Sequence, residues 1–296
     1  MPVLGGGIFL SALPYLSAQI ALCTLWEGAD RRSLNLVGLA RRFASWKGFE
    51  VFMKNEGDGF IFPTMIWLSV IIPALCVNEA FYAREHGLVW WRVLAFNVLR
   101  IGPMYKNFAL AYTLAHKEFH TFGGVFVNRL NSMGVRFAFN WIAGPFFGIL
   151  PGTFTHSHQY NHHKYNNGPC DVYSTGGYPR DSLWNFMRYI YIWFGYASNV
   201  SSILHFVREG RYSWAVQTVA ATAYYCAIFA AVAAISPEWA CVSLLWAFIE
   251  GNILLAMVNW VWHAFIDPKD PDNAFTTSTT IVDGQEFIFS EEYHVV

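Results

Sequence analysis

Histidines are the residues of this chain whose type and spacing could do chemistry. The chain has ten of them, and most gather at four places. These are His116 with His120; His156, His158, His162 and His163; His263; and His294. Imidazole is a good ligand for iron, zinc, copper or nickel. One metal ion rarely needs more than four protein ligands, so seven or eight converging histidines predict a site for two metal ions.

The spacing of these residues adds a geometric argument. Three pairs are four residues apart: His116 and His120, His158 and His162, and Asn259 and His263. On an α-helix, residues four apart project from one face. His156 and His163 are seven apart, so we expect them to share a second face. His86 and His205 fall outside the groups, and we expect both to be structural.

Long apolar runs are the elements that must position these histidines. Four are long enough to be considered as membrane spans: Phe60 to Val77, Leu88 to Ala115, Trp214 to Ile235, and Trp239 to Trp262. A spanning helix needs about 20 apolar residues. The chain is 55% hydrophobic and 13% charged, whereas a soluble domain carries about 25% charged residues. The sequence therefore predicts an all-α integral membrane protein, with about four transmembrane helices in two hairpins.

Two of the apolar segments are irregular. Arg100 interrupts the run from Leu88 to Ala115, so that helix must bend or turn this side chain towards the protein interior. The segment from Arg136 to Thr155 is long enough to span, but Gly144-Pro145, Gly148 and Pro151-Gly152 break it. We expect this segment to be re-entrant or interfacial.

Basic residues predict the topology. Six precede the first run, eight lie between the second and third runs, and Lys269 follows the fourth, whereas the loop after the first run holds only Arg84. Because cytoplasmic loops carry the excess of Lys and Arg, these basic segments are expected in the cytosol. If the segment from Arg136 to Thr155 does not cross, every grouped histidine then lies on the cytosolic side.

The bulk properties narrow the other possibilities. The net charge of −1 argues against a nucleic-acid partner, which would require a basic surface. No polar linker divides the chain, so we expect one domain over residues 1–296. The five cysteines form no CxxC pair and are expected to be small buried hydrophobes.

At its histidines the chain resembles the membrane fatty acid desaturase superfamily, which carries three histidine boxes. The first box, HxxxH, matches as His116-Lys-Glu-Phe-His120, and the second, HxxxHH, matches as His158-Gln-Tyr-Asn-His162-His163. Asn259-Trp-Val-Trp-His263 is similar to an additional element of the acyl-CoA branch. The resemblance runs from about Phe60 to the end of the sequence.

The third box departs from the family pattern. Glu292-Tyr293-His294-Val295-Val296 looks like its opening, but the two histidines expected next are not in the sequence given. The sequence is therefore expected to be truncated within the third box. We expect this chain, as given, to bind metal incompletely and to be inactive.

The resemblance implies a site, cofactors and partners. The implied ligands are His116, His120, His158, His162, His163, His263 and His294, with His156 and Asn259 as additional or outer-shell groups. They would hold two non-haem iron ions and use O2 as co-substrate. The implied substrate is a lipid or acyl thioester in the membrane, and the electron donor is a separate cytochrome b5 or ferredoxin. Seven polar residues could orient the histidine rings, and the sequence does not rank them. They are Glu118, Asn161, Asn166, Asp171, Asp267, Glu291 and Glu292.

The implied activity is desaturation of a fatty acyl chain, and other functions remain open. A membrane di-iron hydroxylase or monooxygenase of alkanes, fatty acids or related lipids uses similar histidine boxes. A membrane zinc protease would need HExxH, but Glu118 lies one position late for that motif. A metal transporter would place its histidines within the spans. A soluble di-iron carboxylate bundle would need two Glu-x-x-His motifs and two further glutamates.

Overall fold

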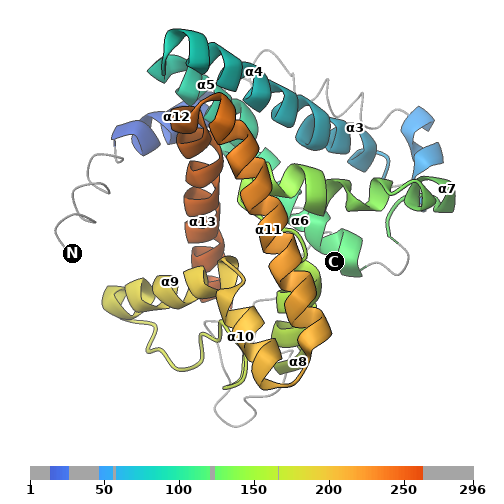
Figure 1. Ribbon diagram of the computed structural model, residues 1–296, viewed down its shortest axis with the longest axis vertical. Coiled ribbons are helices and arrows are strands. Elements are labelled where there is room, and N and C mark those ends of the chain that lie inside the picture. The colour runs from blue at the N-terminus through green and yellow to red at the C-terminus, as the bar shows by residue number, and fades with distance from the viewer. Residues whose placement is uncertain (1–13, 27–46, 56–57, 121–123, 166, 263–296) are drawn as a thin grey trace.

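A computed structural model describes residues 14–26, 47–55, 58–120, 124–165 and 167–262, and these residues form a helical bundle (Figure 1). A helix over residues 14–26 is followed by η2 (Lys47–Phe52), α3 (Ile61–Ile66), η4 (Trp67–Ile71), α4 (Ile72–His86), α5 (Trp90–Ile101), η5 (Pro103–Tyr105), α6 (Lys106–His120), α7 (Asn128–Ser132), η6 (Val135–Phe137), η7 (Ala138–Ala143), η8 (Gly144–Phe147), η9 (Thr153–His162), α8 (His163–Tyr165), α9 (Leu183–Ala197), α10 (Val200–Arg208), α11 (Tyr212–Ile235), α12 (Pro237–Ala240), η10 (Cys241–Leu245) and α13 (Trp246–Trp262). The described residues contain no strand beyond one isolated bridge, Met53 with Phe126.

Three helices of the described chain are long and apolar enough to cross a membrane. They are Ile61–His86, Tyr212–Ile235 and Pro237–Val261. The last two form the predicted hairpin, because Ser236 ends the first and its hydroxyl accepts a hydrogen bond from the Trp239 amide at 3.3 Å. Figure 1 shows α11 and α13 meeting at the top near α12 and diverging below, with α9 at the lower end of α13.

The run from Leu88 to Ala115 is bent, which is one of the alternatives that Arg100 left open, so it is not among these three continuous helices. α5 ends at Gly102, whose φ is 73°, and α6 begins at Lys106. Between them, Met104 and Tyr105 have φ values of 46° and 62°. This left-handed backbone is strained for residues other than glycine, and it bends the chain sharply.

The side chain of Arg100 faces the protein interior, which is one of the two alternatives expected from the sequence. Its side chain is fully buried, and its Nη2 lies 2.6 Å from Glu250 Oε2 in α13. Asn97 Oδ1 also accepts hydrogen bonds from this guanidinium. A buried charge needs such a partner, so this ion pair joins α5 to the last span.

The segment from Arg136 to Thr155 is buried and broken, and both its ends lie near one end of α6. At its start, Asn140 Nδ2 donates to Ala115 O at 3.2 Å. Further along, Phe147 O accepts from the Tyr112 hydroxyl at 3.1 Å, one turn earlier on α6. The chain then turns and η9 returns towards the end of α6. This path is what a re-entrant segment requires.

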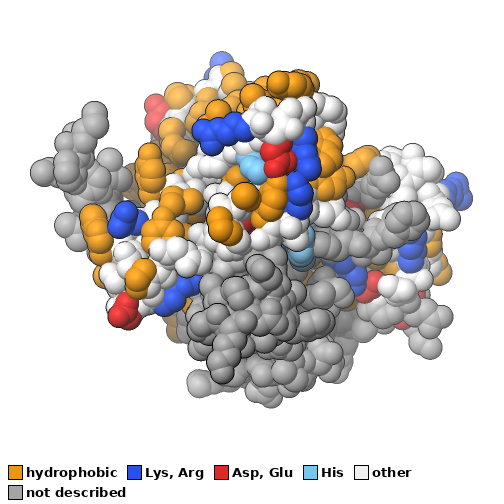
Figure 2. Space-filling view, turned by 90° about the horizontal axis from the view of Figure 1, so that it is seen from below, with side chains coloured by type: hydrophobic (Ala, Val, Ile, Leu, Met, Phe, Trp, Pro, Cys, Tyr) orange, Lys and Arg blue, Asp and Glu red, His pale blue; other side chains and the backbone are white. Residues whose placement is uncertain are grey.

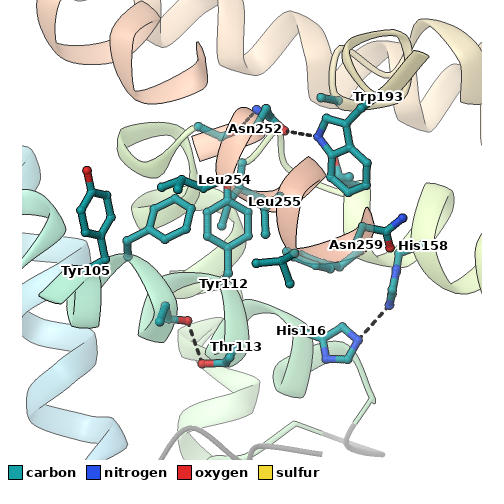
Figure 3. A pocket seen from close by; sticks show the side chains of 18 of the residues that line it. Tyr105, Tyr112, Thr113, His116, His158, Trp193, Asn252, Leu254, Leu255 and Asn259 are labelled. Atoms are coloured by element: carbon teal, nitrogen blue, oxygen red, sulfur yellow. Dashed lines mark hydrogen bonds between the residues drawn. The ribbon is translucent and has the colours of Figure 1, made fainter. Parts of the chain in front are cut away.

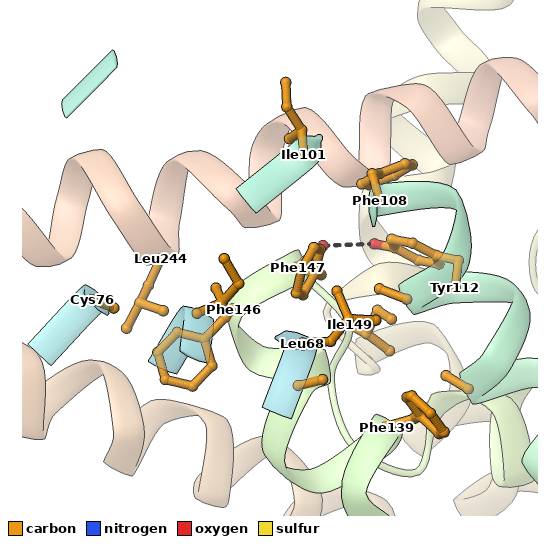
Figure 4. Packing of buried hydrophobic residues seen from close by; sticks show 14 of the residues in the cluster. Leu68, Cys76, Ile101, Phe108, Tyr112, Phe139, Phe146, Phe147, Ile149 and Leu244 are labelled. Atoms are coloured by element: carbon orange, nitrogen blue, oxygen red, sulfur yellow. Dashed lines mark hydrogen bonds between the residues drawn. The ribbon is translucent and has the colours of Figure 1, made fainter. Parts of the chain in front are cut away.

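The turn of this segment reaches the middle of the last span. Gly148 O accepts from Asn252 Nδ2 at 3.0 Å, and a Cβ placed on Gly148 would lie 2.4 Å from Ala247 O. Only glycine allows two backbones to approach so closely. Figure 4 shows the adjacent Phe146 and Phe147 packed among Leu68 of the first span and Leu244 of the last.

The helix α9 has an exposed apolar face near the lower end of the last span. α9 exposes Leu183, Trp184, Met187 and Tyr191, while its other face packs Tyr189, Trp193 and Tyr196 into a core cluster. This pattern is typical of a helix lying in the membrane interface. Basic and histidine side chains also gather on the face seen from below (Figure 2).

Candidate metal centre

Three histidines from the first two boxes meet at the lower end of the bundle. His116 Nε2, from α6, lies 2.8 Å from His158 Nε2 in η9. His163 Nε2, at the start of α8, lies 3.0 Å from the same His158 nitrogen. One ligand atom from each of the three residues lies within 4.8 Å of the other two. The two boxes are thus on one side of the bundle, as the ligand hypothesis demanded.

The distances between these nitrogens suit one metal ion. Imidazole nitrogens coordinate at about 2.1 Å. Two such nitrogens at a right angle around one ion lie about 3.0 Å apart, which is close to the 2.8 and 3.0 Å found here. The donor set is neutral imidazole, which iron accepts readily.

A π-helix decides which histidines of the second box converge. Thr153–His162 is π-helical, so residues five apart, rather than four, lie closest on one face. His163, five residues after His158, therefore reaches its ring nitrogen. The prediction that His156 and His163 share a face is wrong. The winding instead directs His156 to α11, where its Nε2 lies 3.2 Å from Gln217 Oε1.

His162 is oriented by a carboxylate. Its Nδ1 lies 2.5 Å from Asp171 Oδ2, and the Asp171 side chain is fully buried. Metal-binding histidines commonly hold their second nitrogen in this way, which leaves Nε2 for the ion. The backbone amides of Asn167 and Tyr173 also donate to the Asp171 carboxylate, at 3.1 and 3.2 Å. The loop after the second box therefore folds around this carboxylate.

Tyr173 orients His158, and the sequence reasoning did not single it out. Its hydroxyl lies 2.8 Å from His158 Nδ1, and its ring stacks on His162 with centroids 4.5 Å apart. Burial raises the pKa of Tyr173, so the phenol stays protonated and hydrogen bonds to Tyr196. A proton on His158 Nδ1 that is donated to the Tyr173 oxygen would leave Nε2 available to a metal ion. The proximity of Tyr173 in sequence to Asp171 is the signal that could have identified it.

The remaining predicted site residues are placed only in part. His120 ends α6 one turn after His116, and its side chain lies outside the described residues, as do His263 and His294 entirely. Burial lowers the pKa of His156, so this ring is neutral beside Gln217. Asn259 donates to the Tyr189 hydroxyl at 2.6 Å, close to the histidines.

The two histidines expected to be structural lie elsewhere. His86 is exposed beside Glu85, and His205 contacts Glu209 at 3.4 Å. Neither takes part in the converging group among the described residues.

An apolar cavity of about 470 Å³ ends at the histidines. His116, His158 and Asn259 lie at one end, and Tyr105 of the kink lies at the other (Figure 3). Met104, which precedes Tyr105 in the kink, also lines the cavity. Between the two ends the wall is mostly aromatic and aliphatic, with Phe108, Tyr112, Ile149, Leu150, Phe154, Leu254, Leu255 and Val258. This volume and lining are those of a small-molecule site for an apolar ligand.

Comparison with known proteins identifies the family. The fatty acid desaturase family model matches residues 88–296. The chain belongs to the fatty acid desaturase family. Its membership confirms the resemblance carried by the histidine boxes, and it makes the protein a member of a family of membrane oxidoreductases that act on lipids. No curated protein and no solved structure matches this desaturase family member.

The described residues fit the iron that the desaturase family uses. The Nε2 atoms of His116, His158 and His163 converge at coordination spacing. The Nδ1 atoms of His158 and His162 are held from outside by Tyr173 and Asp171. Imidazole rings whose Nδ1 atoms are held by hydrogen bonds while their Nε2 atoms converge have the arrangement expected for metal ligands.

Proposed function

We propose that this protein is a membrane di-iron fatty acyl desaturase, which introduces a double bond into an acyl chain using O2 and electrons from a separate donor. The observation that supports this most directly is the apolar cavity of about 470 Å³ that ends at His116 and His158. An unactivated methylene has no polar handle, so the protein must position it by the shape of an apolar channel.

Two iron ions are proposed to bind to His116, His120, His158, His162, His163, His263 and His294. Bound there, they would supply the activation of O2 and the removal of hydrogen from a methylene. The protein's own groups hold the ligands still: Asp171 fixes His162 and Tyr173 fixes His158. Such outer contacts commonly change metal affinity by about 10- to 100-fold.

The cavity wall would position the acyl chain and exclude water from the histidines. Phe154 packs edge-on against both His116 and His158, with ring centroids 5.7 and 5.8 Å apart. Gly148 and Asn252 fix the re-entrant turn against the last span. A rigid apolar wall beside the ligands keeps one segment of an acyl chain close to the reacting centre.

The proposed setting is a multi-pass membrane protein with its histidine cluster on the cytosolic side. The basic side chains near the histidine face suit that side. A cytochrome b5 or a ferredoxin would deliver electrons there, and the substrate would be an acyl thioester or a lipid. The organisation as a single domain over residues 1–296 belongs to the same proposal.

Lipid profiling of a host that expresses the full-length protein, with a complete third histidine box, tests this proposal. We expect new unsaturated acyl chains, and we expect them to vanish with His162→Ala. Hydroxylated chains in place of unsaturated ones would instead identify the alternative, a membrane di-iron hydroxylase or monooxygenase. An iron-loaded protein that changes no lipid, with its electron donor present, would contradict both.

A further inference from the structure

The far end of the apolar cavity lies about halfway along the last span. Tyr105 lines that end, and its hydroxyl donates to Glu250 Oε1 at 3.2 Å. Glu250 lies at the middle of the span Pro237–Val261. Asn259, at the histidine end, is nine residues further on, which corresponds to about 14 Å along a helix. One leaflet of the hydrocarbon core is about 15 Å thick, so the cavity reaches from the interface to about the bilayer midplane.

The cavity reaches the outer surface at this end. Among its lining residues, those exposed on the outside of the described structure are Ile20, Thr24 and Met104. Ile20 is 46% exposed and Met104 is 45% exposed, although both also face the cavity. The lining residues at the histidine end are buried or half-buried. The exposed rim is thus formed by the N-terminal helix on one side and the kink on the other.

The rim is apolar and its frame is rigid. Leu22 and Leu25 extend the apolar surface of the N-terminal helix beside it. Behind it, Gln19 donates to Glu250 and, at 3.3 Å, to the Tyr105 hydroxyl. These bonds tie the N-terminal helix, the kink and the last span together. Glu250, the carboxylate behind this end, is buried and paired with Arg100, so the exposed rim itself is formed by Ile20, Thr24 and Met104 and suits hydrocarbon rather than water.

The left-handed backbone at Met104 places its side chain at this rim. A helix continued straight from α5 would carry the chain past this point, whereas the φ values of 46° and 62° at Met104 and Tyr105 send one side chain to the opening and the other to Glu250. Strained backbone of this kind persists where the surrounding structure holds it, and it is concentrated at functional sites.

We propose that the cavity is open at its midplane end, and that the methyl end of a long acyl chain passes out between Ile20, Thr24 and Met104 into the hydrocarbon core. This inference rests on the proposed function. It makes long acyl chains, including those longer than one leaflet, the substrate class. The protein would then select the reacting carbon by its distance from the histidine end, and the cavity would set no upper limit on chain length.

Photo-crosslinking tests the opening without relying on turnover. The probes are saturated fatty acids of increasing length that carry a diazirine at the methyl end, added to the protein in lipid nanodiscs. We expect short probes to label the inner wall near Cys23 and Phe108. We expect long probes to label Met104 and the surrounding lipids. If long probes do not bind, or label only the inner wall, the inference that the cavity is open at its midplane end is wrong.

A matched pair of variants on one helix sharpens the test. Ile20→Trp fills the rim, whereas Leu22→Trp places the same bulk on the exposed surface outside the cavity. We expect Ile20→Trp to weaken binding of long probes roughly tenfold relative to short ones, and Leu22→Trp to leave the ratio unchanged. Equal effects on short and long probes would overturn the inference. Failure of every probe to label the cavity would instead contradict the proposed function itself.

Discussion

At the scale of single residues, the site depends on groups that touch the histidines from outside. Asp171 and Tyr173 come from one loop after the second box, and each contacts the Nδ1 atom of a different histidine. Both are buried, so their contacts are not weakened by competition with water. The two side chains fix the ring orientations and leave the Nε2 atoms for a metal ion.

Replacing Asp171 with asparagine tests the first of these contacts. Asp171→Asn keeps the side-chain shape but removes the charge beside His162 Nδ1. We expect iron affinity to fall about 10- to 100-fold, because the ring loses its orientation and basicity. Bound iron per protein, measured by inductively coupled plasma mass spectrometry, checks this. Asp181→Asn, at an exposed position, is the control, and equal iron content in both variants would argue against the role of Asp171.

Replacing Tyr173 with phenylalanine separates its hydroxyl from its ring. Tyr173→Phe retains the stacking on His162 and removes the partner of His158 Nδ1. We expect about a tenfold loss of iron affinity with little change in thermal stability. The control is Tyr191→Phe, whose side chain is exposed. A loss of stability without any loss of iron affinity would show that the hydroxyl serves the fold instead.

At the scale of the elements, close backbone contacts and one buried ion pair hold the helices in place. The re-entrant segment is fixed against α13 at Gly148, and α5 is fixed against α13 by Arg100 and Glu250. Neither contact is local in sequence. The contact at Gly148 positions the cavity wall. The Arg100–Glu250 ion pair holds α5, the helix that precedes the kink at the far end of the cavity.

The close approach at Gly148 predicts a large effect for one added methyl group. Gly148→Ala would place its Cβ 2.4 Å from Ala247 O, at a φ of +81° that disfavours alanine. We expect a loss of about 1–3 kcal/mol in stability, measured as a lower Tm of the purified protein. Gly177→Ala is the control, because its Cβ would meet nothing within 4 Å. A normal Tm for Gly148→Ala would show that the segment does not pack against α13 in this way.

We expect removal of the buried Arg100–Glu250 ion pair to lower stability far more than removal of a more exposed ion pair. Glu250→Gln leaves Arg100 charged and fully buried, so we expect a loss of about 3–5 kcal/mol. Glu79→Gln removes the partner of Arg92 in a partly exposed pair, and we expect about 0–1 kcal/mol. Combining Arg100→Met with Glu250→Leu should recover much of the loss. Denaturation in detergent measures all three, and similar losses for the two single variants would refute the contrast.

At the scale of the whole molecule, α8, which carries His163, and α4 lie at opposite ends of the helical bundle (Figure 1). The cluster and Cys170 lie near the end of the last span, whereas Glu85 lies at the end of the first. The cavity joins the histidine end to the middle of the bundle. This arrangement would let chemistry occur at the interface while the acyl chain stays in an apolar environment.

Labelling with a membrane-impermeant maleimide in intact cells tests this arrangement. Cys170 is exposed, and we expect it to react only after the membrane is permeabilised. In a Cys170→Ser background, Glu85→Cys is expected to react without permeabilisation, because Glu85 lies in the last turn of α4, at the end of the first span away from the histidine cluster. Reaction of both positions from the same side would contradict the proposed topology.

The sequence by itself determined the family and most of the apolar elements, and it supplied the histidines on which the proposed chemistry rests. Histidine spacing and long apolar runs are local patterns, so they can be recognised without knowledge of distant contacts. The hairpin at Ser236 and the irregular segment before the second box followed from such patterns. The tertiary structure alone decided that Arg100 is buried, since only the distant Glu250 makes a buried charge acceptable there. It also decided that His163, not His162, pairs most closely with His158, because the π-helical winding of η9 does not follow from residue spacing. Tyr173 belongs with these, because its role comes from a loop that folds back onto the histidines rather than from any repeat in the sequence.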